Sequence, residues 1–245
     1  QGDAALVYWP DGRTWLIDGG PKGTKLLKYL RRKGIHHLDA IFLSHPHPDH
    51  IGGVLPIIKE LQVERVWTVR PPEKKEFFYQ ILWKEMEKKG IAIAYPNEQP
   101  EDGAVILHPL GGWRGPKSNR VNEESLVLKI EYGEHSFLFT GDIEKGAEKY
   151  LLPTLSPVTV VKVPHHGSKT SSTSDFVQRV QPQFTVFSCG QGNRFKHPHI
   201  QSLWQWRHSN ILRTDLQGTI KIQSKGEGEL LITTESDLRS FFWKY

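Results

Sequence analysis

The chain has 245 residues, of which 37% are hydrophobic and 24% are charged, and its formal net charge at pH 7 is +5. This length is enough to bury a full core, as one large domain or two small ones, and the composition is that of a globular protein. No apolar run is long enough to cross a bilayer and no signal segment opens the chain, so we expect it to be soluble as given, and its single cysteine excludes intrachain disulfides and cysteine-based zinc sites.

Predicted strands and helices alternate in the first part of the chain. Two short apolar runs on either side of Pro-Asp-Gly predict a hairpin with strands at residues 5–9 and 14–18. Leucines at helical spacing before a glycine predict a helix over residues 24–34. Further helices are expected at residues 52–61 and 75–90. Short apolar runs predict strands at residues 38–44, 63–69 and 91–95.

The second part of the chain is richer in strands. They are predicted at residues 104–110, 125–133, 135–142, 158–167, 184–190, 218–224 and 228–235. One helix is expected at residues 200–209, and the glycines and prolines of residues 109–119 predict a mobile loop. No internal repeat or domain linker is visible, so we predict a layered α/β protein with partly antiparallel sheets in a single domain over residues 1–245. Because the sequence starts without a methionine, we expect it to be a piece of a longer protein.

The stretch Ser44–Gly53, Ser-His-Pro-His-Pro-Asp-His-Ile-Gly-Gly, directly follows a predicted strand. Imidazole is the commonest protein ligand of transition metals, and a carboxylate suits hard divalent ions. Each proline favours extended backbone before it, where residues two apart point the same way, so His45 and His47 can converge on one ion. Asp49 and His50 fall near the start of the next helix and form a second cluster. The spacing therefore predicts two adjacent metal half-sites, against the alternative of a histidine-rich surface loop.

Ligand-type residues also follow two later strands. Asp142 ends the strand predicted at residues 135–142, after a glycine that permits a sharp turn, and His165 and His166 end the strand predicted at residues 158–167. Taken alone, Asp142 could be only a turn residue. Since one loop cannot supply all the ligands of a pair of metal sites, these later strand ends are the expected source of the others.

These residues resemble the metallo-β-lactamase superfamily, whose signature His-x-His-x-Asp-His spans His45–His50 here. "LIDGG" around Asp18, "FTGD" at Asp142 and "PHHG" at His165 and His166 fall in the order of that superfamily. The resemblance implies an α/β (α+β) fold, the αββα four-layer sandwich, with the metal site at one edge of the two sheets. It also implies a metal-dependent hydrolase.

Longer stretches are similar to the lactamase-like domain of the ComEC family, channel proteins that internalise DNA in naturally competent bacteria. They include "QGDAALVYWPDGRTWLIDGG", "VKVPHHGSKTSS" and "GNRFKHPH". This resemblance implies a phosphodiesterase, a nuclease that degrades the DNA strand that is not imported. It also implies DNA and the transmembrane channel part of the same full-length protein as partners, and an extracytoplasmic position at the bacterial cytoplasmic membrane. We expect the isolated domain to be monomeric.

The resemblance implies six metal ligands in this chain: His45, His47, Asp49, His50, Asp142 and His166. The superfamily normally has a further histidine for the His45/His47 ion, near the position where this chain has Asn122. We therefore place Asn122 beside the ligands, and we interpret the more distant His108 as structural. One or two divalent ions are expected, with the His45/His47 ion bound weakly. A site rich in oxygen ligands and water favours Mn²⁺, with Zn²⁺ or Mg²⁺ as alternatives.

The resemblance also implies two catalytic roles. The superfamily ligand commonly precedes a small residue, as His166 precedes Gly167, which leaves His165 for a phosphate oxygen or the leaving group. Asp49 is expected to orient the attacking water as well as bind metal. Asp18 is expected to accept a hydrogen bond from a ligand histidine, the alternative being a turn-forming aspartate.

Polar residues in two loops are the expected substrate contacts. The loop after the histidine pair offers backbone and hydroxyl donors and an ammonium group, and the loop after residues 184–190 adds an amide and an imidazole. They are Ser168, Lys169, Thr170, Asn193 and His197.

Tryptophans and charge bear on nucleic-acid binding. Among the eight tryptophans, Trp113 is the candidate for stacking DNA bases, because its loop also contains Arg114, Lys117 and Arg120. Trp204 and Trp206 fall on a predicted helix, and Trp67 and Trp83 lie in apolar patterns. Most of the tryptophans are expected to be in the core. The small excess of positive charge favours an anionic partner such as nucleic acid, and equally suits a solvated basic surface.

Three functions stay open on the residues alone. The first is a metal-dependent phosphodiesterase that acts on DNA. The second is a metallo-hydrolase of a small phosphoester, a thioester or a lactam, which the same motif permits. The third is a catalytically weak DNA-binding module of the uptake channel, which Asn122 favours. Cys189 is not expected to be a nucleophile, because a lone cysteine after a strand is more typical of a small buried apolar side chain.

Overall fold

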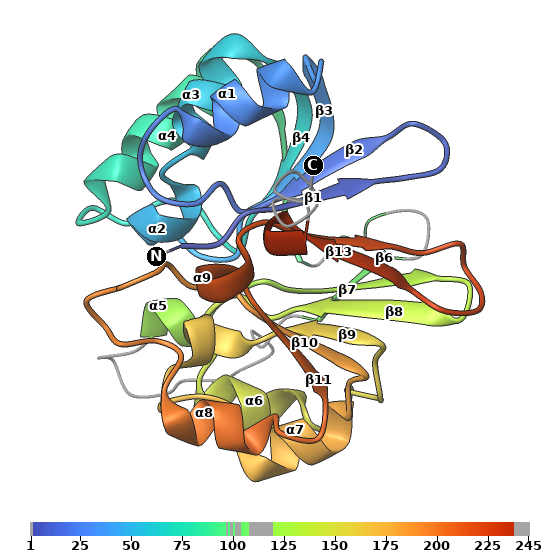
Figure 1. The fold of residues 1–245 in the computed structure, drawn as a ribbon. Helices are drawn as coiled ribbons and strands as arrows, with labels where there is room; N and C mark the ends of the chain where they lie inside the picture. Colours follow the sequence, from blue (N-terminus) through green and yellow to red (C-terminus); the bar gives the residue numbers. More distant parts are fainter. Residues whose placement is uncertain (1, 97, 99, 101–103, 108–119, 238–245) are drawn as a thin grey trace. The chain divides into compact units, whose positions relative to one another are not determined.

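Figure 1 shows the computed structural model, which describes residues 2–96, 98, 100, 104–107 and 120–237. The chain forms two units, each with its own large β-sheet. The N-terminal unit consists of residues 2–98 and 124–126, and the C-terminal unit of residues 99–123 and 127–245. The expectation of a single domain over residues 1–245 stays a prediction. Within the described part of the chain, no helix combines the length and apolarity that a membrane span requires.

The N-terminal unit holds a five-stranded sheet in the order β1-β2-β3-β4-β5. Its strands are β1 (Ala5–Tyr8), β2 (Thr14–Ile17), β3 (His37–Phe42), β4 (Gln62–Trp67) and β5 (Ala92–Ala94). β1 pairs antiparallel with β2 across the predicted hairpin, and the other pairs are parallel. Parallel strands need crossover connections, and here these contain helices. They are α1 (Lys25–Arg32), α2 (Pro48–Ile51), α3 (Val54–Glu60) and α4 (Phe77–Lys88).

Helices α1, α3 and α4 cover one face of this sheet (Figure 1). The helical spacing of their apolar residues gives each helix a buried stripe. Leu30 of α1, Ile57 of α3 and Leu82 of α4 are fully buried in one cluster with Ile41 of β3. Burial of one such side chain stabilises the fold by about 1.5–3 kcal/mol. This packing fixes the carboxyl end of β3, where the histidine-rich stretch begins.

The C-terminal unit holds a six-stranded sheet in the order β11-β10-β9-β8-β7-β6. Its strands are β6 (Ala104–Leu107), β7 (Val127–Tyr132), β8 (His135–Phe139), β9 (Val160–Lys162), β10 (Phe184–Phe187) and β11 (Asn210–Arg213). β6, β7 and β8 are antiparallel neighbours, whereas β8, β9, β10 and β11 are parallel. A separate antiparallel pair follows, β12 (Ile220–Gln223) and β13 (Leu231–Thr234).

Short helices accompany the parallel strands of this unit. They are α5 (Arg120–Glu123), α6 (Lys145–Leu151), the 3₁₀ turn η1 (Pro164–Gly167), α7 (Ser174–Val180), α8 (Ile200–Gln205) and α9 (Thr214–Gln217). Leu151 of α6, Phe176 of α7 and Trp206 after α8 are buried against Val161 and Phe187 of the sheet. Each unit is therefore a mixed sheet with helices packed on it, and the predicted α/β class is confirmed.

Most of the predicted elements are present with shorter bounds. The hairpin is β1 and β2, and the helix predicted over residues 75–90 is α4. Among the described elements, β11 and the helices α5, α6, α7 and α9 were not predicted from the sequence. α7 begins after Thr173, whose hydroxyl accepts a hydrogen bond from the Phe176 amide at 3.4 Å, so a local N-cap signal was present in the sequence. α6 has no such local cap.

The N-terminus of α6 is capped by Glu123, which is distant in the sequence. The buried Glu123 carboxylate accepts hydrogen bonds from the amides of Gly146 at 3.0 Å, Ala147 at 2.6 Å and Glu144 at 3.2 Å. Burial raises the pKa of Glu123, and these amide donors oppose that shift. The first amides of a helix have no partner within the helix, so this carboxylate satisfies groups that would otherwise be buried without an acceptor.

Tryptophans divide between the core and the surface. Trp67 and Trp206 are buried, in line with the expectation that most tryptophans lie in the core. Trp204, which the sequence analysis considered together with Trp206, is 65% exposed. The reason is geometric, because residues two apart on a helix of 3.6 residues per turn point in different directions. Trp113 and its basic neighbours Arg114 and Lys117 lie outside the described residues, as does His108.

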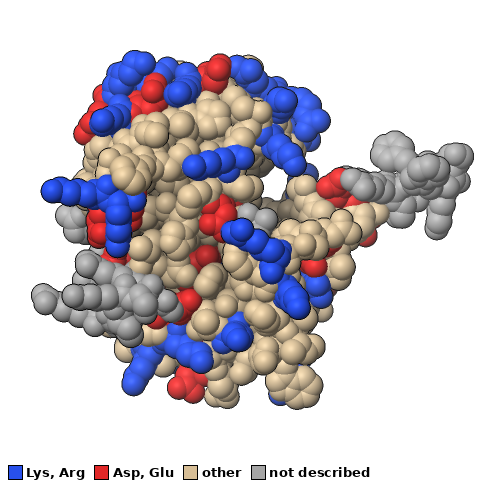
Figure 2. Space-filling model, turned by 90° about the vertical axis from the view of Figure 1, so that its left-hand side faces the viewer, with Lys and Arg blue, Asp and Glu red and all other residues tan. Residues whose placement is uncertain are grey.

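Basic side chains are conspicuous on the N-terminal unit. At the top of Figure 2, where the helices of this unit lie, Lys and Arg gather with Asp and Glu among them. Four of them lie exposed on α1: Lys25, Lys28, Arg31 and Arg32. Arg31 forms an ion pair with Glu60 at 2.7 Å, in which both side chains are about half exposed. Pairs of this kind contribute little to stability.

We predict that Glu123→Ala lowers the free energy of unfolding by about 1–3 kcal/mol, because buried amides at the start of α6 lose their acceptor. Chemical denaturation followed by circular dichroism measures the change. Glu131→Ala is the matched control, since the Glu131 side chain is half exposed and its described ion pair is with Lys129. Equal unfolding free energies for Glu123→Ala and the control would contradict the capping role.

Candidate functional site

The histidine-rich stretch lies at the carboxyl end of β3 in the N-terminal unit. Its backbone is extended up to His47 (φ −69°, ψ 141°), and Pro48 begins α2. The bend after His50 brings the helix back to the chain that follows β2, where the amide of Gly19 donates to the carbonyl of His50 at 2.6 Å. A side chain at Gly53 would collide with the Gly19 carbonyl, so this approach requires glycine.

His45 and His47 converge as the alternating pattern predicts. Nε2 of the buried His45 lies 3.0 Å from Nδ1 of His47. Two nitrogens that are each about 2.0–2.1 Å from one ion lie about 2.9–3.4 Å apart at ordinary coordination angles. The pair therefore has the spacing of two ligands of a single metal ion.

Asp18 holds this stretch from the end of β2. Its carboxylate accepts hydrogen bonds from the Ser44 amide at 2.8 Å, the Ser44 hydroxyl at 2.7 Å and Nδ1 of His50 at 2.8 Å (Nδ1 is the donor because an aspartate oxygen has no proton to give). The Ser44 hydroxyl also lies 3.0 Å from Nδ1 of His45. The predicted hydrogen bond between Asp18 and a histidine of the motif is present, and it leaves the lone pair of His50 on Nε2.

Asp3 is a residue of this group that the sequence analysis missed. Its buried carboxylate lies 3.9 Å from Nδ1 of His50, and its amide donates to the Asp49 carbonyl at 3.2 Å. A carboxylate immediately before the first strand was the available signal. Asp49 itself is half-buried in the first turn of α2.

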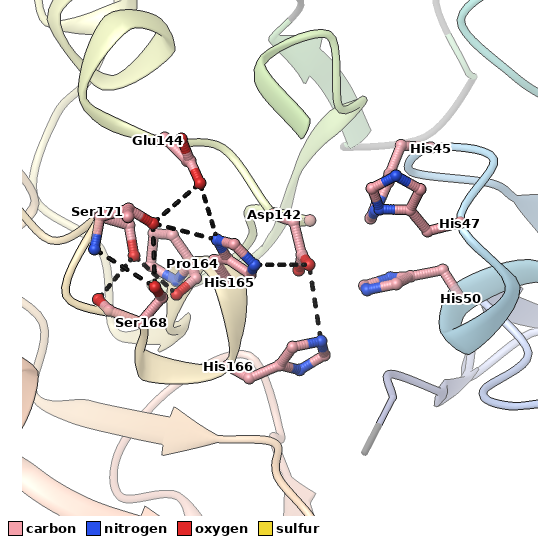
Figure 3. Close-up of polar contacts among 12 residues, drawn as sticks. His45, His47, His50, Asp142, Glu144, Pro164, His165, His166, Ser168 and Ser171 are labelled. Atoms are coloured by element: carbon pink, nitrogen blue, oxygen red, sulfur yellow. Dashed lines mark hydrogen bonds and ion pairs between the residues drawn. The ribbon is translucent and has the colours of Figure 1, made fainter. Parts of the chain in front are cut away.

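The C-terminal unit brings together Asp142, His165 and His166 (Figure 3). Gly141, with φ of 54°, turns the chain after β8 and allows Asp142 to follow the strand end. Oδ2 of Asp142 lies 3.5 Å from Nε2 of His166 and 3.8 Å from Nε2 of His165. Nζ of Lys162 is 3.6 Å from the other carboxylate oxygen. The carboxylate is buried, so these contacts form in a low-dielectric environment.

The two histidines occupy a strained turn. His165 (φ 49°) and His166 (φ 54°) are both left-handed, which costs about 1–2 kcal/mol for each L-residue. The buried His166 donates from Nδ1 to the Ser188 carbonyl at 2.8 Å, because a carbonyl can only accept. Its lone pair is therefore on Nε2, on the side of Asp142. His166 is buried whereas His165 is partly exposed, and the choice of His166 as the metal ligand stays a prediction.

His165 has a different environment. It is partly exposed, and its Nδ1 lies 3.1 Å from Oε1 of the buried Glu144. The same oxygen accepts a hydrogen bond from the Thr170 hydroxyl at 2.8 Å. Glu144 orients the imidazole of His165, and the sequence analysis missed it. A carboxylate two residues after Asp142 was the only local signal.

The predicted substrate contacts in the loop after the histidines differ in availability. The Ser168 and Thr170 hydroxyls bond to each other at 2.9 Å, and Thr170 also bonds to Glu144. Lys169 is exposed and lines a cavity of about 310 Å³ together with Lys145. Hydroxyl and amide side chains form the rest of the lining: Ser171, Ser172, Thr173, Ser174, Gln201, Ser202 and Gln205. The roles of these residues toward a substrate stay predictions.

Asn193 and His197 belong to the loop that follows β10. The Asn193 amide donates to the carbonyls of Gly190 at 2.9 Å and His197 at 2.6 Å, so it braces this loop. The His197 ring lies 5.8 Å from the ring of His165 and 6.3 Å from that of His166, centre to centre. Burial, together with the charges of these two histidines, lowers the pKa of His197 to about 4. His197 is therefore neutral at neutral pH.

Two further predictions concern residues outside these groups. Asn122 is half-buried in α5, directly before the capping Glu123. Cys189 is buried, and burial with the neighbouring Asp215 carboxylate raises the pKa of its thiol to about 12. A thiol that stays protonated is a poor nucleophile, so the interpretation of Cys189 as a buried structural residue is confirmed.

The donors of each unit fit a divalent ion by their chemistry. The N-terminal unit offers imidazole nitrogens beside the buried carboxylates of Asp18 and Asp3, and the C-terminal unit offers one imidazole beside a carboxylate. Neutral imidazole and carboxylate together suit Mn²⁺, Zn²⁺ and Fe²⁺. In both units a hydrogen bond to the other ring nitrogen fixes the tautomer, as is usual for metal-ligating histidines.

Comparison with known proteins places these groups in a family. The sequence matches the metallo-β-lactamase superfamily over residues 1–190. ComE operon protein 3 of Bacillus subtilis (strain 168) is 34% identical over 215 residues, which are 82% of this chain and 26% of that protein. Competence protein ComA of Neisseria gonorrhoeae is 29% identical over 244 residues, which are 90% of this chain and 32% of that protein.

Solved structures agree on the fold. The crystal structure of a metal-dependent hydrolase of the β-lactamase superfamily has a TM-score of 0.55 and 18% identity, and the match covers 81% of this chain and 85% of the other. The chain spans about a quarter to a third of the length of the two competence-related relatives. Because the family match covers most of the chain, the chain belongs to the metallo-β-lactamase superfamily, and it resembles proteins of bacterial competence over nearly its whole length.

Proposed function

We propose that this chain is a metal-dependent phosphodiesterase that cleaves DNA during uptake by competent cells and degrades the strand that is not imported. The observation that carries the proposal is the pair of histidine groups, in which His50 and His166 each have a tautomer fixed by a hydrogen bond at Nδ1. Family membership and the similarity to competence proteins support it.

We infer that the two groups hold one or two divalent ions between them. His45 and His47 would bind one ion, and Asp49, His50, Asp142 and His166 the other. The missing histidine near Asn122 makes the first site the weaker one, so Mn²⁺ is favoured over Zn²⁺. When bound, such an ion lowers the pKa of water and neutralises charge on a phosphoryl oxygen.

Two protein residues would then accept and donate the protons that move during hydrolysis. The water oxygen forms a bond to phosphorus while the bond from phosphorus to the leaving oxygen breaks. The Asp49 carboxylate accepts the proton of the water. His165, protonated on both ring nitrogens and held at Nδ1 by Glu144, would give its Nε2 proton to the leaving oxygen and become neutral.

The substrate and the cellular setting belong to the same proposal. Lys145 and Lys169, which line one cavity, supply positive charge for the phosphates of DNA, and His197 offers a neutral imidazole beside His165. Because the relatives are several times longer than this chain, we propose that it acts with the transmembrane part of the same protein, on the outer side of the cytoplasmic membrane.

We predict that Asp18→Asn weakens metal binding about 10–100-fold, because an amide is a poorer acceptor for His50 than a carboxylate. Isothermal titration with Mn²⁺ measures the affinity. Asp11→Asn is the control, since Asp11 is an exposed residue of the β1–β2 turn. Unchanged affinity in a folded Asp18→Asn protein would contradict the role of Asp18.

The two adjacent histidines are expected to respond differently to substitution. His166→Ala should bind about one metal ion fewer, whereas His165→Ala should keep its metal and lose about 10²–10⁴-fold in turnover, as expected for a general acid. Elemental analysis by mass spectrometry and steady-state kinetics provide the two readouts. Loss of a metal ion in His165→Ala, with metal retained and turnover lost in His166→Ala, would make His165 the ligand and His166 the general acid.

Incubation with linear DNA and Mn²⁺ tests the proposed function itself. The wild-type chain should cut DNA, and Asp49→Ala should lower the rate at least about 10³-fold while it still binds DNA. Hydrolysis of a small ester without cleavage of DNA would indicate a different metallo-hydrolase. Binding without cleavage in the wild type would indicate a DNA-binding module.

A further inference from the structure

Large apolar side chains are exposed where the loop after β10 leads into α8. Phe195 is 47% exposed, Ile200 74% and Trp204 65%. Ile200 and Trp204 are four residues apart on α8, so they lie on the same face of the helix. Exposed groups of large apolar residues mark surfaces that contact a partner.

Each of the two aromatic rings has an arginine over it. Cζ of Arg194 lies 4.7 Å from the ring centre of Phe195, and Cζ of Arg207 lies 4.3 Å from that of Trp204. Arg207 is held there by a hydrogen bond to the Trp204 carbonyl at 2.8 Å. The arrangement places positive charge next to exposed aromatic faces, which is the combination that single-stranded nucleic-acid sites use.

The charge of the surrounding segment has one sign. Between Asp175 and Asp215 the sequence contains no Asp or Glu, and it contains five Lys or Arg residues. They are Arg179, Arg194, Lys196, Arg207 and Arg213. Arg213 is paired with Asp215 at 2.7 Å, but Arg194 and Arg207 lie over the exposed rings, and these two favour a partner that is anionic as well as aromatic.

The Phe195 ring neighbours the histidines of the C-terminal unit. The Phe195 ring is nearly parallel to that of His197, at 22° and 5.8 Å between centres, and the His197 ring in turn neighbours those of His165 and His166. The amide of His199 donates to the Gly167 carbonyl at 2.9 Å, which ties this loop to the histidine turn. A strand bound at Phe195 would therefore lie close to His165.

We propose that Phe195 and Trp204 stack the bases of a single-stranded segment of DNA, with Arg194 and Arg207 beside its phosphates. The inference rests on the proposed function and specifies the form of its substrate. A duplex keeps its bases stacked inside, whereas an unpaired strand exposes both planar bases and phosphates, so it matches the rings and the charge together. The surface thus selects an unpaired end or a strand already separated from its partner.

Binding without metal tests the inference independently of cleavage. In chelator-containing buffer, fluorescence anisotropy compares a labelled single-stranded oligonucleotide, an abasic strand of equal length and a blunt duplex. Wild type should bind the single strand most tightly. Phe195→Ala and Trp204→Ala should each raise its Kd about 5-fold or more and leave the Kd of the abasic strand unchanged, while Trp204→Phe should keep most of the affinity.

Tyr150→Ala is the matched control, because Tyr150 of α6 is a 40% exposed aromatic residue of the same unit. It should bind all three substrates as the wild type does. Equal binding of the single and abasic strands by wild type, unchanged Kd in both alanine variants, or an equal loss in Tyr150→Ala would each overturn the inference. If the protein stacks bases but cuts no DNA, the stacking inference holds and the proposed nuclease function fails. If it cuts DNA but does not stack bases, the nuclease function holds and the stacking inference fails.

Discussion

A neutral imidazole has a lone pair on only one of its two ring nitrogens, so the nitrogen that donates a hydrogen bond decides which one can bind a metal. Asp18 imposes this choice on His50, and the Ser188 carbonyl imposes it on His166. Each contact is possible only because a strand end, β2 in one unit and the segment after β10 in the other, lies beside the histidine turn. The sheets thus determine the protonation pattern of the site, and the chemistry proposed for the chain depends on it.

Both histidine groups also depend on unusual backbone. Asp18, His165 and His166 all have positive φ, and all three are buried or partly buried. Such conformations cost about 1–2 kcal/mol each and persist where the surroundings hold them. Asp18 is held by hydrogen bonds: its backbone amide donates to the Phe42 carbonyl, and its carboxylate accepts from the amide and hydroxyl of Ser44. Strain is thus concentrated at the turns that aim the functional side chains, while the helices that pack on the sheets supply the stability.

Local pattern was sufficient for much of the fold and for one part of the site. Strand-then-histidine spacing predicted the convergence of His45 and His47, because both signals lie within a few residues. Glu144, Asp3 and the Ser188 carbonyl were missed, since their relation to a histidine exists only after distant segments pack. The cap of α6 was missed for the same reason.

The fixing of His50 and His166 by different kinds of acceptor has an evolutionary consequence. His166 bonds to a main-chain oxygen, which every amino acid provides, so substitution at Ser188 leaves that acceptor in place. His50 bonds to a side-chain carboxylate, and few replacements at Asp18 could serve it. Homologous sequences should therefore vary in amino acid at position 188 and keep aspartate at position 18.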